Sequence, residues 1–245
     1  MSLRVANFNI KHAAPARGYI GRTRLLAKAC AEIDADILAL QEVDRRVWRS
    51  GFADLVMEAA GVTYSDASFG KAMGANLVSL INPGGQYGIA LLVKGRVKSQ
   101  EVLPLKGDYV RFAFGKRRNI APEPRIATFS EVETESGITA RVVNTHIGGP
   151  CREEFVGTIL SELAQYPEPH ILLGDYNTGR RDMRQWLGAT ALPLQFAPRP
   201  LELSVKSRQS DHIAVNGFTI DSVTARRFDI SDHPAIIAEL SVTAS

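Results

Sequence analysis

Short apolar segments that end in a carboxylate, an amide or an imidazole recur along this chain, and they constrain its fold more than any other feature. The segment "ILLGDYNTG" (171–179) shows the pattern, since three apolar residues lead directly into Gly-Asp-Tyr-Asn. Such a run is typical of a buried strand, and Gly and Asn are typical of the turn that ends it. Asp175 and Asn177 are either ordinary turn formers, which bond the local backbone, or side chains that a rigid strand presents for binding.

The same arrangement is repeated at other strand ends. Asn9 lies near the end of 3–10, Glu42 ends 36–42, and His146 ends 138–146. Asp211 begins a later strand, and the sequence Ser-Asp-His directly precedes the last one. Each residue alone has an ordinary interpretation as a turn former or an exposed charge. If the strand ends converge, one site would contain Asn9, Glu42, His146, Asp175, Asn177, Asp232 and His233.

The residue types in this set indicate a cation site. Three carboxylates in one cleft repel each other unless a cation neutralises them. Carboxylate and amide oxygens are hard ligands that suit Mg²⁺ or Mn²⁺, and the set has no thiolate that would select zinc. The two histidines suit work beside such an ion, one to activate water and one to stabilise charge on phosphate oxygens.

Hydrophobic periodicity predicts a mixed α/β fold. We expect helices at 22–33, 52–61, 153–166 and 181–189. We expect strands at 3–10, 36–42, 87–93, 125–133, 138–146, 170–175 and 234–242, with two more between 211 and 228. Residues 104–124 and 190–209 are expected to be irregular. No repeat or linker is visible, so we predict one domain over 1–245, with mixed sheets and helices on their outer faces.

The composition is that of a globular protein and limits the classes to which the chain can belong. Of the 245 residues, 45% are hydrophobic and 22% charged, which is typical of globular proteins. No apolar stretch is long enough to span a membrane, and no secretory signal is visible, so we expect a cytoplasmic monomer without integral membrane association. The two cysteines, Cys30 and Cys151, support neither a disulfide framework nor a zinc site. Cys30 falls on the apolar stripe of 22–33, and we expect it in the core.

The order of these motifs resembles the endonuclease/exonuclease/phosphatase superfamily, the group with DNase I, exonuclease III-type repair nucleases, sphingomyelinases and inositol-phosphate phosphatases. The matching segments, in order, are "LRVANFNI", "ADILALQEVD", "YGIALLV", "RVVNTHIG", "ILLGDYNTG", "SDHIAV" and "ISDHPAII". Each match alone is weak, but seven in the right order over nearly the whole chain are specific. The resemblance implies a four-layer α/β/β/α sandwich of two mixed sheets, and metal-dependent phosphoester hydrolysis.

The resemblance also implies roles for individual residues. Glu42, with Asn9 and Asp232, would hold the ion, and Asp211 would orient His233, the general base. Asp175 and Asn177 would position the water and the scissile phosphate, and His146 would stabilise the transition state. A basic residue often precedes the central hairpin in the family, and Arg125 would fill this place and contact the substrate phosphate. The chain departs from the family at Tyr176, where Phe is usual, at Arg152, where an Arg-then-Gln pattern is missing, and in its two long loops.

Three functions remain open from the sequence. The first is a Mg²⁺- or Mn²⁺-dependent hydrolase of small or lipid-derived phosphate esters, favoured by the mild net charge of +3. The second is a DNA- or RNA-directed nuclease of the same fold, supported by the Arg-rich segments 111–118 and 180–184. The third is a catalytically inactive relative that binds phosphorylated ligands. All motif residues are present, which disfavours the third.

Overall fold

The computed structural model describes residues 2–14, 21–73, 84–106, 112–113, 116–117, 124–203 and 209–243. Two six-stranded sheets make up most of this part. In the first sheet the strand order is β13-β14-β1-β2-β4-β3, and in the second it is β11-β12-β10-β9-β8-β5. The first sheet consists of β1 (Ser2–Asn9), β2 (Ile37–Arg45), β3 (Asp66–Met73), β4 (Gln86–Val93), β13 (Phe218–Arg226) and β14 (Ala235–Val242). The second consists of β5 (Gly95–Leu105), β8 (Arg125–Thr134), β9 (Thr139–His146), β10 (His170–Asp175), β11 (Gln195–Phe196) and β12 (Asp211–Asn216).

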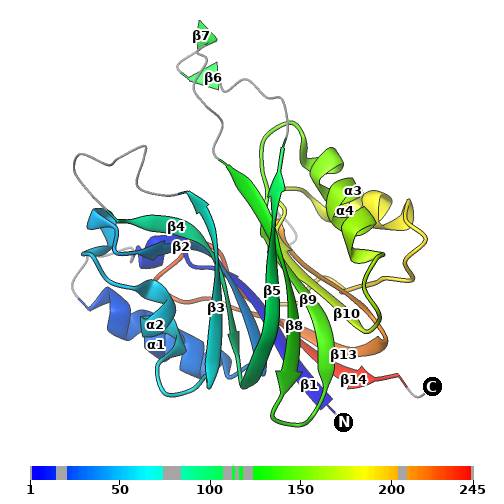
Figure 1. The fold of residues 1–245 in the computed structure, drawn as a ribbon, viewed down its shortest axis with the longest axis horizontal. Helices are drawn as coiled ribbons and strands as arrows, with labels where there is room; N and C mark the ends of the chain where they lie inside the picture. The colour runs from blue at the N-terminus through cyan, green and yellow to red at the C-terminus, as the bar shows by residue number, and fades with distance from the viewer. Residues whose placement is uncertain are drawn as a thin grey trace.

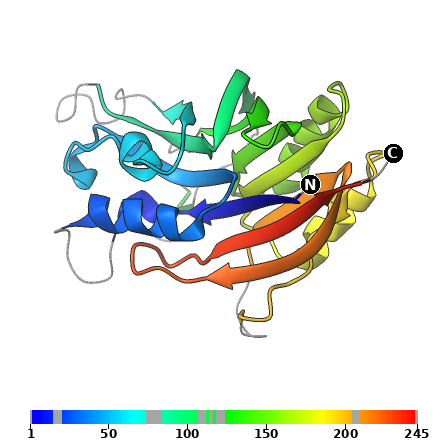
Figure 2. The ribbon, with the colours of Figure 1, turned by 90° about the horizontal axis from the view of Figure 1, so that it is seen from below.

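Both sheets are mixed, as the sequence predicts. β1 pairs with β2, and β9 with β10, in parallel, whereas the other neighbours are antiparallel. Figure 2 shows β13 and β14 beside β1, so the last strands complete the sheet that the first strand begins. Two short strands, β6 (Phe112–Ala113) and β7 (Lys116–Arg117), pair only with each other.

Helices cover the outer face of each sheet. α1 (Arg22–Ile33) and α2 (Leu55–Ala60) lie on the first sheet, and α3 (Arg152–Leu163) and α4 (Arg180–Gly188) on the second (Figure 1). Single turns of 3₁₀ helix occur at η1 (Lys11–Ala13) and η2 (Trp48–Ser50). The chain therefore forms the four-layer α/β/β/α sandwich that the sequence predicts. In the described part, no helix combines the length and the apolar character needed to cross a membrane.

Three apolar cores lie between the four layers. One lies between α1, α2 and the first sheet, one between the two sheets, and one between the second sheet and α3, α4. Cys30 is fully buried in the first of these, which confirms the expectation for this residue. Leu25, in contrast, is 40% exposed although it follows the same helical spacing. These cores fix the two sheets face to face, and so fix the strand ends that carry the polar side chains.

The sequence did not predict three edge strands, β3, β5 and the two-residue β11, which lies in the segment 190–209 expected to be irregular. β3 and β5 are the outermost strands of their sheets, and both are largely half-buried or exposed. Their charged and polar residues suit an edge, because charge there discourages pairing with another chain. The same residues interrupt the alternation of apolar and polar residues by which a strand is recognised in a sequence. β5 extends to Leu105 and so enters the segment expected to be irregular. α2 begins at Leu55 rather than 52, because Asp54 caps it by accepting a hydrogen bond from the backbone N–H of Val56.

Candidate active site

Three polar side chains form a row across neighbouring strands of the second sheet. Asp175, the last residue of β10, is in register with His146 at the end of β9 and with Asp211 at the start of β12. All three residues are nearly buried. Side chains of residues in register on adjacent strands lie close together on the same face. The strand pairing thus brings together three residues that the sequence placed at separate strand ends.

Asn9 joins this row to the first sheet. Its Nδ2 donates to Oδ2 of Asp175 over 2.9 Å and to Oε1 of Glu42 over 3.0 Å. Its Oδ1 accepts a hydrogen bond from the backbone N–H of Lys11 over 3.0 Å, which fixes the orientation of the amide. The Asn9 amide group therefore lies between two carboxylates that come from different sheets. Glu42 and Asp175 meet at the same mouth of the sandwich, as the sequence predicts.

A β-bulge in β2 places Glu42 at this mouth. The register between β2 and β4 shifts between Leu40 and Val43, and Glu42 has a φ of 56°, in the left-handed region. Such a conformation is costly for a residue other than glycine and is retained mostly where the surrounding structure imposes it. The bulge inserts an unpaired residue, which redirects the side chains that follow. Gln41 consequently points between the sheets while Glu42 reaches the cleft, where Oε2 lies 3.3 Å from Nε2 of His12.

His233 is held by Asp211. Its Nδ1 donates to Oδ2 of Asp211 over 2.8 Å, and its backbone N–H donates to Oγ of Ser231 over 3.1 Å. Burial acts to lower the pKa of His233, but the hydrogen bond and charge of Asp211, together with the charges of Asp175 and Asp232, raise it to about 9. A carboxylate on Nδ1 fixes the tautomer and leaves Nε2 directed away from Asp211. Asp211 and His233 thus form the pair that the sequence predicts.

A chain of buried amides supports Asp211 from the other sheet. Nδ2 of Asn7 donates to Oδ1 of Asp211 over 3.1 Å. Nε2 of Gln41 donates to Oδ1 of Asn7 and to Oδ1 of Asn144, both over 2.8 Å. Asn144 in turn donates to the backbone carbonyls of Leu40 and Ala90. This polar chain crosses the apolar interface between the sheets, so the position of Asp211 depends on residues of β1, β2 and β9.

On the other side of Asp175, Asn177 and His146 are paired. Nδ2 of Asn177 donates to the backbone oxygen of Ile147 over 2.9 Å and lies 3.2 Å from Nε2 of His146. Nε2 of His146 is therefore the acceptor in this pair. Burial, and then the positive charge of Arg125, hold the pKa of His146 well below its usual value, so the ring is neutral. A Cβ on Gly148 would lie 3.3 Å from Nη2 of Arg125 and 3.8 Å from Nδ2 of Asn177, which places the Arg125 guanidinium at this end of the row.

The centre of the row fits a hard divalent cation. Asp175, Asp211 and His233 each offer a ligand atom, and these atoms lie within 4.8 Å of one another. Burial, and then the charge of Asp211, raise the pKa of Asp175 to about 6, because the two carboxylates lie close together there. The Asn9 amide hydrogens between Glu42 and Asp175 mark a second point where positive charge is favoured. The oxygen donors are those that Mg²⁺ and Mn²⁺ prefer.

Asp232 occupies a different position from the other carboxylates. Its Oδ2 pairs with Nζ of Lys11 at 2.5 Å, and its side chain is 60% exposed. Burial acts to raise the pKa of Asp232, but the hydrogen bond and charge of Lys11 hold it below its usual value. The carboxylate that the sequence assigned to the ion is therefore already paired with a cation of the chain, at the rim of the site.

Sequence reasoning missed several residues that contact the site. Asn7 is two residues before Asn9, and side chains two apart in a strand share a face, so the repeated asparagine in "NFN" was the available signal. His12, which contacts Glu42, lies in η1 at a φ of 56°. Its proximity depends on the fold of that turn, and no pattern in the sequence indicates it. The Arg-rich segment 111–118 lies largely outside the described residues, and none of its side chains is described.

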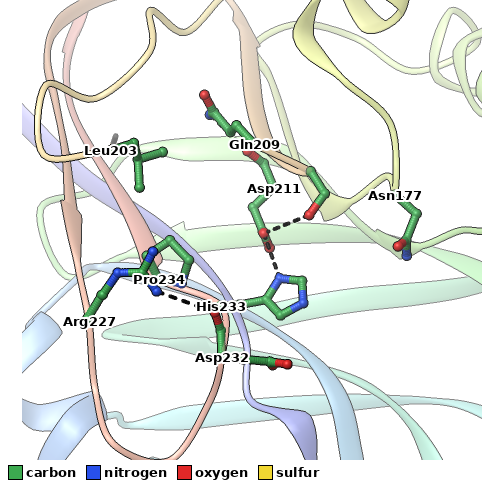
Figure 3. A pocket seen from close by; sticks show the side chains of 9 residues that line it. Asn177, Leu203, Gln209, Asp211, Arg227, Asp232, His233 and Pro234 are labelled. Carbon is green, nitrogen blue, oxygen red and sulfur yellow. Dashed lines mark hydrogen bonds and ion pairs between the residues drawn. The ribbon is translucent and has the colours of Figure 1, made fainter. Parts of the chain in front are cut away.

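A cavity of about 380 Å³ opens beside His233. Figure 3 shows Asp211 and His233 at its centre, with Asn177 on one side and Arg227 on the other. Its wall is completed by Leu203, Gln209, Ser210, Asp232 and Pro234. This volume is near the lower end for small-molecule sites. The polar row therefore has an adjoining space for a ligand.

Comparison with known sequences identifies one family. The model of a family described as "Endonuclease/Exonuclease/phosphatase family" matches residues 6–233. The matched range contains every residue of the polar row and the strand ends of both sheets at the mouth of the sandwich. The search of curated protein sequences gave no match.

Solved structures with the same fold are distant in sequence. An endonuclease/exonuclease/phosphatase from Beutenbergia cavernae has 20% identity and a TM-score of 0.72, with 99% of this chain and 72% of the other covered. The human Nocturnin catalytic domain with bound sulfate has 20% identity and a TM-score of 0.69, with 99% and 95% covered. A mannosyl-6-phosphatase from Bacteroides thetaiotaomicron has 17% identity and a TM-score of 0.66, with 98% and 99% covered. At these identities the likeness shows the fold alone.

Proposed function

The chain belongs to the endonuclease/exonuclease/phosphatase family, and we propose that it hydrolyses phosphoester bonds with a divalent cation, Mg²⁺ or Mn²⁺, beside Asp175. The observation that carries this proposal is the row formed by His146, Asp175 and Asp211, with His233 bonded to Asp211 at the edge of a cavity. A set of buried carboxylates beside an imidazole is costly to maintain, and such sets are typical of active sites.

Glu42 and Asp175 are the residues that would hold the cation, with Asp211 and His233 next to Asp175, and Asn9 would position the two carboxylates through its amide hydrogens. When bound, the cation supplies positive charge that polarises a phosphate oxygen and offsets the carboxylates that raise the pKa of His233. Asp232 was assigned to the ion on the resemblance. Its pairing with Lys11 supports a place at the rim instead.

His233 is the proposed general base. Asp211 holds its Nδ1, and Nε2 then accepts the proton of the attacking water. The base must be neutral to do so. The amide chain through Asn7 supports this step indirectly, because it fixes Asp211 and through it the imidazole.

Arg125 is the proposed donor to the phosphate oxygens, and Asn177 lies beside it with both amide hydrogens bound within the protein. Nδ2 of Asn177 is held by the carbonyl of Ile147, and His146 accepts from the same amide group. We therefore assign His146 to positioning Asn177, rather than to direct stabilisation of the transition state. The oxygens of the phosphate gain charge as water attacks, and fixed donors aimed at them lower the barrier.

A substrate panel tests the proposal. Bis-p-nitrophenyl phosphate, p-nitrophenyl phosphate and plasmid DNA should each be assayed with Mg²⁺, with Mn²⁺ and with EDTA. We expect turnover of at least one phosphate ester that EDTA abolishes. Plasmid DNA as the preferred substrate, with a steep fall in rate as salt rises, would instead assign the chain to nucleases. Binding of phosphate esters without turnover under any ion would refute the enzymatic proposal.

A further inference from the structure

Arg227 lies in the cavity beside His233 and has no role in the proposed reaction. It is the first residue after β13, and it lines the cavity of about 380 Å³ opposite Asn177 (Figure 3). Its Nη1 lies 3.4 Å from the backbone oxygen of Asp232, which is a long hydrogen bond. That carbonyl belongs to the peptide unit that joins Asp232 to His233. The guanidinium is therefore one peptide unit from the proposed base.

The preceding residue, Arg226, shows what a structural arginine looks like in this region. Its guanidinium pairs with the carboxylate of Glu32 and donates to the backbone oxygen of Glu32 over 3.2 Å. It also stacks on Phe228, with Cζ at 5.1 Å from the ring centroid. Arg226 is bound to α1, whereas Arg227 lines the cavity beside His233 and also a second hollow next to α1. The two residues share charge and size but differ in their surroundings.

Arg227 pairs with no carboxylate among the described residues. Asp232 presents only its backbone oxygen to Arg227, and its carboxylate is bound by Lys11 at 2.5 Å. A guanidinium has five N–H donors, arranged to bind a phosphate or carboxylate through two parallel hydrogen bonds. Most of these donors are therefore available to a ligand in the cavity.

We propose that Arg227 binds a second anionic group of the substrate, so that the preferred substrates are small phosphate esters that carry another phosphate or a carboxylate. This inference rests on the proposed function, since it places the scissile phosphate at His233 and Asn177. The second anion then lies on the opposite side of His233, and the skeleton that joins the two groups contacts Leu203 and Pro234. A cavity of about 380 Å³ suits such a molecule better than a polymer.

Matched substrate pairs test the inference. Phosphate release should be measured for fructose 1,6-bisphosphate against fructose 6-phosphate, and for 6-phosphogluconate against glucose 6-phosphate. The first pair adds a phosphate and the second adds a carboxylate, so the two pairs distinguish the sources of the second anion. We expect the protein to prefer the two-anion member of at least one pair by about 10-fold or more in kcat/KM, the size of a hydrogen bond between charged groups.

Two variants separate the role of Arg227 from general electrostatics. Arg227→Gln should remove most of the preference, through a higher KM for the two-anion substrate, and Arg227→Lys should retain part of it. Arg226→Gln changes the net charge equally and should keep the wild-type preference. An undiminished preference in Arg227→Gln, or an equal loss in Arg226→Gln, would overturn the inference.

A binding measurement keeps this test independent of the proposed function. Titration calorimetry of the same four ligands should be carried out in the His233→Ala background, with and without Arg227→Gln. The two-anion ligands should bind about 10-fold more tightly, and Arg227→Gln should remove the difference. If bis-p-nitrophenyl phosphate and all sugar phosphates resist hydrolysis, the proposed function fails, and this titration alone decides the role of Arg227. Equal affinity for one-anion and two-anion ligands would reject it.

Discussion

Replacing Asn7 with alanine should lower the free energy of unfolding by about 2–4 kcal/mol, because it breaks the amide chain between the two sheets. Nδ2 of Asn7 is the one side-chain donor to Oδ1 of Asp211 among the described residues, over 3.1 Å. Oδ1 of Asn7 accepts from Gln41 over 2.8 Å. All these groups are buried, so water cannot readily replace the lost partner.

The magnitude follows from which groups lose a partner. A buried acceptor left unsatisfied costs about 1–3 kcal/mol, and a charged one lies toward the upper end of this range. Oδ1 of Asp211 falls in that class. Gln41 loses less, because its Nε2 keeps the hydrogen bond to Asn144. The truncation also leaves a small cavity, which adds to the cost. The total loss is a large part of the roughly 5–15 kcal/mol that stabilises a typical domain.

Urea unfolding followed by circular dichroism measures this loss as a shift of the midpoint at constant slope. Asn216→Ala provides the matched control. Asn216 is also a buried asparagine, 6% exposed, but its Nδ2 has no hydrogen-bond partner among the described residues. Its replacement should cost less than about 1 kcal/mol, since no hydrogen bond is lost. If both variants lose the same stability, the amide chain does not contribute as we argue.

Three further outcomes are expected. His233→Ala should lower kcat for bis-p-nitrophenyl phosphate by about 10²–10⁴-fold with little change in KM, and a near-normal rate would remove His233 from the mechanism. Glu42→Gln should weaken Mn²⁺ binding, followed by electron paramagnetic resonance, by about 10-fold or more, and Asp232→Asn should weaken it less; the reverse order would place the ion at the rim. Burial, and then the charge of Arg180, lower the pKa of His212 to about 4, although its hydrogen bond to Thr178 opposes this. The unfolded chain therefore takes up this proton first, and the contribution of His212 to stability should fall by about 3 kcal/mol as the pH drops from about 6.5 to 4, measured as the difference between the wild type and His212→Asn. Urea unfolding at several pH values checks this, because His212→Asn should flatten the dependence.

The sequence predicts the layers of this fold well because its central strands each contain an uninterrupted run of three or four apolar residues. β2, β10 and β12 are buried along almost their whole length, so their hydrophobicity identifies them without any knowledge of their neighbours. β3 and β5 escaped prediction because an edge strand is defined by what it pairs with, and pairing partners are distant in sequence. The extent of the domain, 1–245, stays a prediction.

For the site, the sequence indicates which strand ends carry polar residues but not how those residues are paired. The row of His146, Asp175 and Asp211 follows from strand register, which depends on the whole sheet. The pairing of Asp232 with Lys11 depends on the turn at η1, whose residues have positive φ angles that no sequence pattern indicates. The catalytic and metal-binding roles of these residues stay predictions until the variants above are measured.

The bulge at Glu42 also determines which face of the first sheet the later side chains of β2 occupy. Before it, Leu38 and Leu40 face the helices while Ile37 and Ala39 face the other sheet, and after it Val43 faces the helices again. In a regular strand of the same sequence, strict alternation would turn Val43 toward the other sheet and exchange the faces of every later residue in the strand. Deleting Glu42 should therefore leave Val43 on its present face but remove the carboxylate from the cleft, and homologous strands should be aligned across this point with the insertion kept in place.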